Sequence, residues 1–290
     1  MASIRELAPA KINLTLNIAG RRADGLHLIE SLVAFADVGD AVTLEVGSAR
    51  RVDVTGPMAG AIAGPNILSR TLALLEEHAP DLKTGPVRLE KHLPVAAGVG
   101  GGSADAGALL RAVRRANASA SASVDWHGLA RALGADVPVC LEARPLWMTG
   151  IGESLVEIER GLARLDAVLV NPMASVPVDK TARVFRALGA APASERYRAP
   201  AAPSVADRGA LLAFMRAQGN ALTDAAQTIV PEIGAVLSAL RALPEIDYAA
   251  LSGAGPTCFG IFPTREAAEA AQMRLAAAHP AWWIVAATIG

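Results

Sequence analysis

The chain has 290 residues, a formal net charge of −1 and a hydrophobic content of 52%. This length suits one large domain or two ordinary ones, and the near-neutral charge argues against non-specific nucleic-acid binding, which needs a basic surface. No apolar run reaches the roughly 18 residues that a membrane helix requires, and the N-terminal sequence lacks the apolar core of a secretory signal. We therefore expect neither a nucleic-acid nor a membrane partner.

Alternating apolar residues predict strands in the first half of the chain at 12–19, 28–36, 41–46 and 87–93. Helical spacing predicts helices at 66–77, 104–115 and 126–133. Because strands and helices do not alternate regularly, this half favours an α+β fold over a Rossmann sheet.

The second half predicts strands at 167–170, 248–252, 257–262 and 282–287, and helices at 178–188, 220–229, 232–243 and 265–279. The intervening segment 189–208 is rich in Ala, Pro and Ser and reads as a long, mobile loop. The order of these elements resembles the split βαβ, ferredoxin-like pattern. We expect one boundary near residue 160, with an N-terminal ATP-binding and catalytic domain at 1–160 and a C-terminal substrate domain at 161–290.

Two cysteines, Cys140 and Cys258, lie far apart in apolar surroundings. They form neither a metal-ligand spacing nor a disulfide framework, so we expect a reducing, cytoplasmic compartment.

A glycine-rich stretch at Pro94–Gly107 reads PVAAGVGGGSADAG. Glycines adopt positive φ without penalty, and with Ser103 as the expected N-cap the following helix would present free N–H groups and a positive dipole end to an anion. A nucleotide's phosphates fit such a cradle; a flexible turn before a helix is the alternative. No Gly-Lys-Ser/Thr follows, so this is no P-loop, and Asp125, at the distance of a dinucleotide-site acid, lies in a polar run rather than after a strand.

Four segments together resemble one superfamily: residues 8–14 (APAKINL), 94–106, 133–138 (LGADVP) and 251–257 (LSGAGPT). Their order and spacing are similar to those of the galactokinase, homoserine kinase, mevalonate kinase and phosphomevalonate kinase (GHMP) superfamily. The resemblance implies a two-domain α+β fold, with an N-terminal domain like domain 2 of ribosomal protein S5 and a ferredoxin-like C-terminal domain.

Within that superfamily, PAKINLTLNIAGRRADGLH and LGADVP resemble the kinases of 4-diphosphocytidyl-2-C-methyl-D-erythritol, which act in the non-mevalonate isoprenoid pathway. The resemblance implies transfer of the γ-phosphate of ATP to the 2-hydroxyl of that small molecule, in a cleft between domains of a monomer or weak homodimer. Mg²⁺ would arrive as Mg-ATP, with no protein ligand named. Three alternatives stay open: another kinase of the superfamily, a non-catalytic nucleotide-binding protein and, more distantly, a Rossmann oxidoreductase.

The resemblance makes Asp136 the base for the hydroxyl proton and puts Lys11 beside it to help polarise the hydroxyl. From the residues alone, Asp136 is equally a turn aspartate after Gly134, and Lys11 a surface lysine on an edge strand.

ATP would be bound by the glycine loop and one residue outside it. Asn66 either approaches the adenine or only caps its helix, while Asp105 either complements the helix dipole or, more weakly, meets a metal. The expected ATP-binding residues are Asn66, Pro94, Gly98, Val99, Gly100, Gly101, Gly102, Ser103 and Ala104.

For the substrate, a neutral His27 matches the polar edge of cytosine because imidazole both donates and accepts. Phe185 either stacks on the base or belongs to the core, and the turn at 253–255 either approaches the substrate phosphates or is a plain hairpin. Leu26 stands where the family commonly has an aromatic residue, which predicts weaker cytidine binding or a compensating aromatic elsewhere. The expected substrate-binding residues are Asn13, Leu26, His27, Phe185, Gly253, Ala254 and Gly255.

Overall fold

The computed structural model describes residues 3–47, 49–62, 64–205 and 207–290. Its contacts divide the chain into two compact units, each drawn from three segments. The first unit is Met1–Lys11, Val38–Val95 and Gly100–Arg144, and the second is Ile12–Asp37, Ala96–Val99 and Pro145–Gly290. The functional division predicted near residue 160 has a single boundary, and it stays a prediction.

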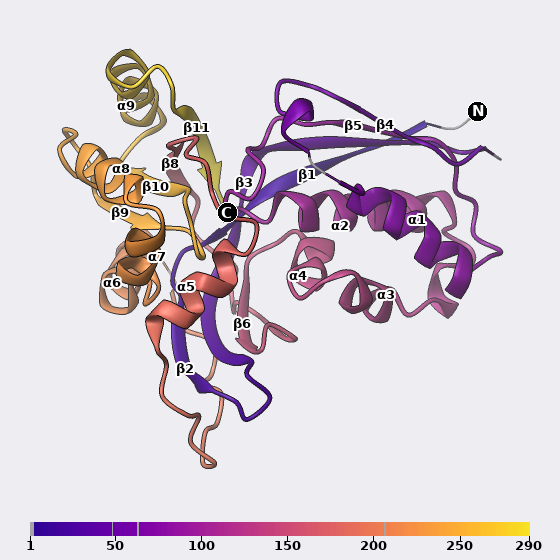
Figure 1. Ribbon diagram of the computed structural model, residues 1–290, viewed down its shortest axis with the longest axis horizontal. Coiled ribbons are helices and arrows are strands. Elements are labelled where there is room, and N and C mark those ends of the chain that lie inside the picture. Colours follow the sequence, from indigo (N-terminus) through magenta and orange to yellow (C-terminus); the bar gives the residue numbers. More distant parts are fainter. Residues whose placement is uncertain (1–2, 48, 63, 206) are drawn as a thin grey trace. The chain divides into compact units, whose positions relative to one another are not determined.

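The first unit packs helices against a small sheet. The second half of β3 (His27–Glu45) pairs with β5 (Val87–Glu90), which pairs in parallel with β4 (Val52–Thr55), and β1 (Ser3–Asn13) also pairs with β3. Figure 1 shows the helices on one side of these strands. They are α1 (Ile67–His78), α2 (Gly101–Ala116), α3 (Trp126–Leu133) and α4 (Val137–Glu142), with 3₁₀ turns at Ala59–Ala61 and Ser121–Ser123.

Local signals account for several of these helices. α1 begins after Asn66, whose side chain accepts a hydrogen bond from the Leu68 N–H, and it buries its apolar face. The Asp125 side chain caps α3 in the same way, and the helix ends at Gly134. The helices expected at 66–77 and 126–133 are therefore confirmed, and Asp125 is a capping residue.

The second unit contains the four antiparallel strands β11–β8–β10–β9, in that spatial order. With α5 after β8 and α9 before β11, this is the ferredoxin-like order, and the α+β prediction is confirmed. The elements of this unit are β2 (Asn17–Arg21), β6 (Leu146–Gly150), β7 (Ser154–Glu157), β8 (Leu165–Asn171), β9 (Tyr248–Leu251), β10 (Cys258–Phe262), β11 (Trp283–Ile289), α5 (Lys180–Leu188), α6 (Arg208–Gln218), α7 (Thr223–Ile229), α8 (Glu232–Arg241) and α9 (Arg265–Ala278).

Three expectations differ from the structure. The strand expected at 12–19 is interrupted, because Leu16 bonds through its N–H to Gly219 and through its carbonyl to Ala221 instead of a neighbouring strand. The strands expected at 28–36 and 41–46 are one strand, β3. Helices α4 and α6 were not predicted, and neither were β4, β6, β7 and the part of β1 before residue 12. Among the described residues, no helix is long and apolar enough to cross a membrane.

Candidate active site

Two charged side chains from distant parts of the sequence meet in the first unit. Lys11 Nζ lies 2.9 Å from Asp136 Oδ2. The Lys11 side chain, on β1, is only 5% exposed, whereas that of Asp136, at the N-terminus of α4, is 41% exposed. A buried ammonium therefore orients a carboxylate that keeps access to solvent, which is the arrangement a base for an incoming hydroxyl needs.

Arg111 on α2 ties together the strand and the helix that carry this pair. Its guanidinium donates to the carbonyl oxygens of Leu7 on β1 (2.5 Å) and Cys140 on α4 (2.6 Å). Close packing adds to this, since a Cβ at Gly107 would lie 2.6 Å from the Cys140 carbonyl oxygen. Burial raises the pKa of the Cys140 thiol to about 12, which makes it inert rather than a nucleophile.

The glycine loop alternates in backbone handedness. Ala96, Gly98 and Gly100 have φ of +56°, +78° and +64°, whereas the residues between them have no positive φ. Such alternation turns successive N–H groups toward one side and forms an anion-binding concavity. The loop passes close to Lys11, because a Cβ at Gly100 would lie 3.3 Å from Cβ of Lys11.

Helix α2 begins earlier than expected. Its N-cap is Gly100, whose carbonyl accepts the Ala104 N–H at 2.7 Å, so Ser103 is the third helical residue. The prediction of Ser103 as the N-cap is wrong, because the left-handed Gly100 already ends the loop. The first N–H groups of α2, at Gly101, Gly102 and Ser103, lack intrahelical acceptors and fit the predicted phosphate cradle. The remaining expected members are the buried Pro94 and Val99.

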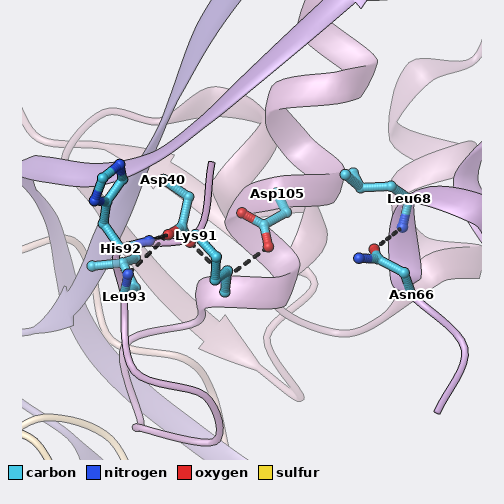
Figure 2. Close-up of polar contacts among 7 residues, drawn as sticks. All are labelled: Asp40, Asn66, Leu68, Lys91, His92, Leu93 and Asp105. Carbon is cyan, nitrogen blue, oxygen red and sulfur yellow. Dashed lines mark hydrogen bonds and ion pairs between the residues drawn. The ribbon is translucent and has the colours of Figure 1, made fainter. Parts of the chain in front are cut away.

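Behind the start of α2 lies a buried charged cluster of Asp40, Lys91 and Asp105 (Figure 2). Lys91 Nζ is 2.5 Å from Asp40 Oδ2 and 2.8 Å from Asp105 Oδ2. Asp40 Oδ1 also accepts the N–H groups of His92 (2.6 Å) and Leu93 (2.8 Å), whereas Asp105 Oδ1 is buried and finds no hydrogen-bond partner among the described residues. A Cβ at Gly101 would lie 3.2 Å from Lys91 Nζ, so the cluster supports the first residue of the helix.

The cluster has two carboxyl groups for one ammonium. Burial, with Asp40 nearby, raises the pKa of Asp105 to about 8 despite the opposing charge of Lys91. Burial alone lowers the pKa of Lys91, but Asp105 and Asp40 outweigh it and raise the pKa overall. At neutral pH the raised pKa of Asp105 favours its neutral form beside Lys91, while Asp40 accepts hydrogen bonds from Lys91, His92 and Leu93. Asp105 stands in the second turn of α2 and is not a first-turn dipole partner.

Asn66 lies on the same unit and is drawn at the right of Figure 2. Its Oδ1 accepts the Leu68 N–H at 2.9 Å, so the helix-capping alternative is confirmed. A contact between the side-chain amide nitrogen of Asn66 and adenine stays a prediction.

In the second unit, His27 and Phe185 lie together, with ring centroids 4.7 Å apart and planes inclined by 33°. Burial and then the charge of Arg21 lower the pKa of His27 from 6.5, which favours the neutral ring that the cytosine prediction requires. Phe185 also packs against the hydrophobic core, so its two alternatives are compatible. Leu26 is 47% exposed, so it lies outside the core.

The turn at Gly253–Gly255 is built by side chains from other segments. Asn13 donates through its backbone N–H to Ser252 Oγ (3.2 Å), and a Cβ at Gly253 would lie 3.2 Å from Asn13 Oδ1. Asn220, which the sequence reading missed, donates to the carbonyls of Leu251 (2.8 Å) and Gly253 (2.9 Å). The chain thus forms a fixed hairpin turn here, with Ala254 buried in it.

Comparison with known proteins bears directly on these segments. The family model described as GHMP kinases N terminal domain matches residues 66–144, and that described as GHMP kinases C terminal matches residues 201–281. The 4-diphosphocytidyl-2-C-methyl-D-erythritol kinase of Rhodopseudomonas palustris is 45% identical over 99% of this chain and 97% of its own length. The chain belongs to this family of GHMP kinases.

Other relatives of this GHMP kinase agree. The enzyme of the same name from Methylorubrum extorquens is 45% identical over 98% of each chain. A crystal structure of 4-(cytidine 5'-diphospho)-2C-methyl-D-erythritol kinase matches with a TM-score of 0.76, at 32% identity over 99% of both chains. A homoserine kinase structure from Cytophaga hutchinsonii, at 18% identity and a TM-score of 0.68, shows the shared fold. The predicted fold, superfamily and kinase activity are confirmed.

Proposed function

We propose that this GHMP kinase transfers the γ-phosphate of ATP to the 2-hydroxyl of 4-diphosphocytidyl-2-C-methyl-D-erythritol, with Asp136 and Lys11 as its catalytic pair. Full-length similarity to kinases of that name supports the substrate. The single observation that carries the residue assignment is the 2.9 Å contact between Lys11 Nζ and Asp136 Oδ2.

The proposed chemistry follows from that contact. Asp136 accepts the proton of the attacking hydroxyl, and Lys11 fixes the carboxylate and stabilises the negative charge of the transferring group. The N–H groups of Gly98 to Ala104 hold the triphosphate, because a helix N-terminus and a loop of alternating handedness both attract anions.

Mg²⁺ would enter with the nucleotide. Among the described residues no group of three His, Cys, Asp or Glu side chains could hold a metal ion. Asp105 Oδ1 has no hydrogen-bond partner in the part of the chain that the structure describes, but its carboxyl is buried beside Lys91, whose ammonium repels a second cation. These residues do not fit a protein-held metal, so we propose that phosphate oxygens and water bind Mg²⁺.

The substrate side is proposed to use His27 and Phe185 for the cytosine, with Asn13 and the 253–255 turn for the polar chain that joins it to the reacting hydroxyl. The contact of His27 with Phe185 supports the first pair, and the contacts of Asn13 with the turn support the second. We further propose that the protein acts in the cytoplasm, in line with its two buried, unpaired cysteines. We also propose that it is a monomer or weak homodimer and that its functional domains divide near residue 160.

A coupled assay of ADP release tests the proposal, with ATP, Mg²⁺ and either the cytidyl substrate, homoserine, mevalonate or galactose. We expect turnover with the cytidyl substrate alone. Turnover with another alcohol would overturn the substrate while keeping the kinase, and ATP binding without turnover of any would remove the catalytic assignment.

A further inference from the structure

Lys180, the first residue of α5, is a buried lysine for which the reaction above has no role. Lys180 is only 4% exposed, and no carboxylate among the described residues forms an ion pair with it. Its ammonium instead donates to two backbone carbonyls, those of Gly255 and, at 3.2 Å, of Ala96. One lies in the C-terminal turn and the other in the glycine loop, and all three residues belong to the second unit.

This contact is one of three that hold consecutive carbonyls of the loop. The Thr257 N–H donates to the Ala97 carbonyl at 3.0 Å, and Ser252 Oγ donates to the Gly98 carbonyl at 3.2 Å. In a trans peptide the carbonyl and the following N–H point in opposite directions. With the carbonyls of residues 96–98 fixed on the turn, the N–H groups of residues 97–99 are directed away from it, as donors for a ligand.

The backbone conformation of Ala96 indicates that the hydrogen bond from Lys180 is needed to keep the loop in place. Its φ of +56° is the left-handed conformation, which costs a residue with a Cβ about 1–2 kcal/mol relative to the usual regions. Such a conformation persists where its surroundings impose it. Close packing of Gly98 on Gly255 restrains the next residues, since a Cβ at Gly98 would lie 2.5 Å from the Gly255 carbonyl oxygen. Lys180 is the group that restrains Ala96 itself.

We propose that Lys180 is a positioning residue for nucleotide binding, which holds the Ala96–Val99 part of the glycine loop against the 252–257 turn and so sets its phosphate-binding N–H groups. The proposal rests on the assignment of the glycine loop to the triphosphate. Lys180 acts through the loop and makes no contact with the reacting atoms.

The charge of Lys180 gives the hold a pH dependence. Burial lowers the pKa of Lys180 to about 8, so the ammonium loses its proton as the pH rises from 7 to 9.5. Hydrogen bonds from a charged donor are roughly twice as strong as neutral ones, so the hold weakens over that range. The charged residues Asp179 and Arg183 at the start of α5 pair with each other at 2.7 Å, and Asp224 stands in the first turn of α7, which packs against α5. Residues 96–99 and 252–257 carry no charged side chain.

Stability changes in the opposite direction. The lysine pKa is 10.5 in the unfolded chain and about 8 in the folded one, so the unfolded state binds more protons between these values. Stability contributed by this group therefore rises with pH from 8 to 10.5, while nucleotide affinity falls. A lysine with only a structural role would not weaken nucleotide binding under conditions that stabilise the fold.

Calorimetric binding of ADP to the full-length protein between pH 6.5 and 9.5 tests the proposal, alongside Lys180→Met and the matched control Lys83→Met, which alters an exposed lysine. We expect Lys180→Met to bind ADP about tenfold more weakly at pH 7 and to lose most of the pH dependence of the wild type. Its melting temperature should equal or exceed that of the wild type, because a buried charge without a carboxylate partner is removed.

Unchanged ADP affinity in Lys180→Met, or the same pH dependence in the variant and the wild type, would overturn the proposal. If Lys180→Met fails to fold, the wild type alone tests the proposal. Its affinity for ADP must fall as the pH rises through 8, while its melting temperature does not fall. Gly101→Val separates this inference from the function beneath it. Loss of ADP binding in Gly101→Val with normal binding in Lys180→Met rejects only the role of Lys180, whereas normal binding in Gly101→Val rejects the glycine-loop assignment itself.

Discussion

Replacing Asp105 by Asn should stabilise the protein near neutral pH and remove part of its pH dependence. The folded protein holds Asp105 protonated to about pH 8, whereas the unfolded chain releases that proton near 3.8. Between these values the folded state binds more protons, so the contribution of Asp105 to stability is complete below pH 3.8 and is lost as the pH rises to 8. Asparagine is a neutral side chain of the same shape and does not titrate.

The size of the effect follows from the same values. A pKa moved from 3.8 to about 8 corresponds to at most about 6 kcal/mol if the carboxyl titrates alone. The carboxyl of Asp105 is coupled to its charged neighbours, which relax around it, so we expect roughly 2 kcal/mol between pH 4.5 and 8. Asparagine can donate from its amide to Asp40 or leave Lys91 on Asp40, whose Oδ2 is 2.5 Å away.

Urea unfolding of the full-length protein at pH 4.5, 6 and 8 measures this difference. The control is Asp81→Asn, which removes an exposed carboxylate from the same unit. Asp105→Asn should lose less stability than the wild type as the pH rises, while Asp81→Asn should follow the wild type. Parallel curves for Asp105→Asn and the wild type would show that Asp105 is already ionised in the fold and would refute the reasoning.

Four further variants test the site. Asp136→Asn should lower turnover about 10²–10⁴-fold in the ADP-release assay while ATP still binds by calorimetry, and near-normal turnover would exclude it as the base. Gly101→Val should weaken ATP binding, because its side chain meets Lys91 Nζ at the start of α2. Lys91→Met should destabilise the protein by about 3–5 kcal/mol in urea unfolding, since it strands two buried carboxyl groups. Leu26→Tyr should lower the Michaelis constant for the cytidyl substrate about tenfold by adding a stacking face, and an unchanged constant would contradict that role.

Much of the fold could be predicted because its signals are local. The Asn66 cap, the buried stripe of α1 and the stop at Gly134 lie within a few residues of the helices they define, and each was identified from the sequence. α6 was missed because it follows the long segment 189–208 and its apolar face is short, with Leu211, Leu212 and Met215 buried. The break at Leu16 was missed because its partners lie more than 200 residues away.

The candidate site divides in the same way. Glycine density and a helix start are visible in the chain, so a glycine loop leading into a helix could be predicted from the residues, and its binding of phosphate stays a prediction. The meeting of Lys11 with Asp136 could be expected only through family resemblance, because no local pattern encodes it. Asp40 and Lys91 carried no signal at all: they are ordinary charged residues 51 positions apart, and such residues normally lie on the surface.

Burial of lysine is what distinguishes these residues once the structure is known. The chain has four lysines, and Lys11, Lys91 and Lys180 are each no more than 4% exposed. A lysine is rarely buried without compensation, because desolvating its charge is costly. Each of the three lies at a different part of the glycine loop: Lys11 against Gly100, Lys91 against Gly101, and Lys180 on the Ala96 carbonyl. Lys11 and Lys91 are held by carboxylates and Lys180 by backbone carbonyls, so each ammonium group is fixed in place before a ligand arrives. Such fixed lysines agree with the proposed phosphate-binding loop, whereas a flexible turn before a helix gives no reason for a protein to bury three lysines beside it.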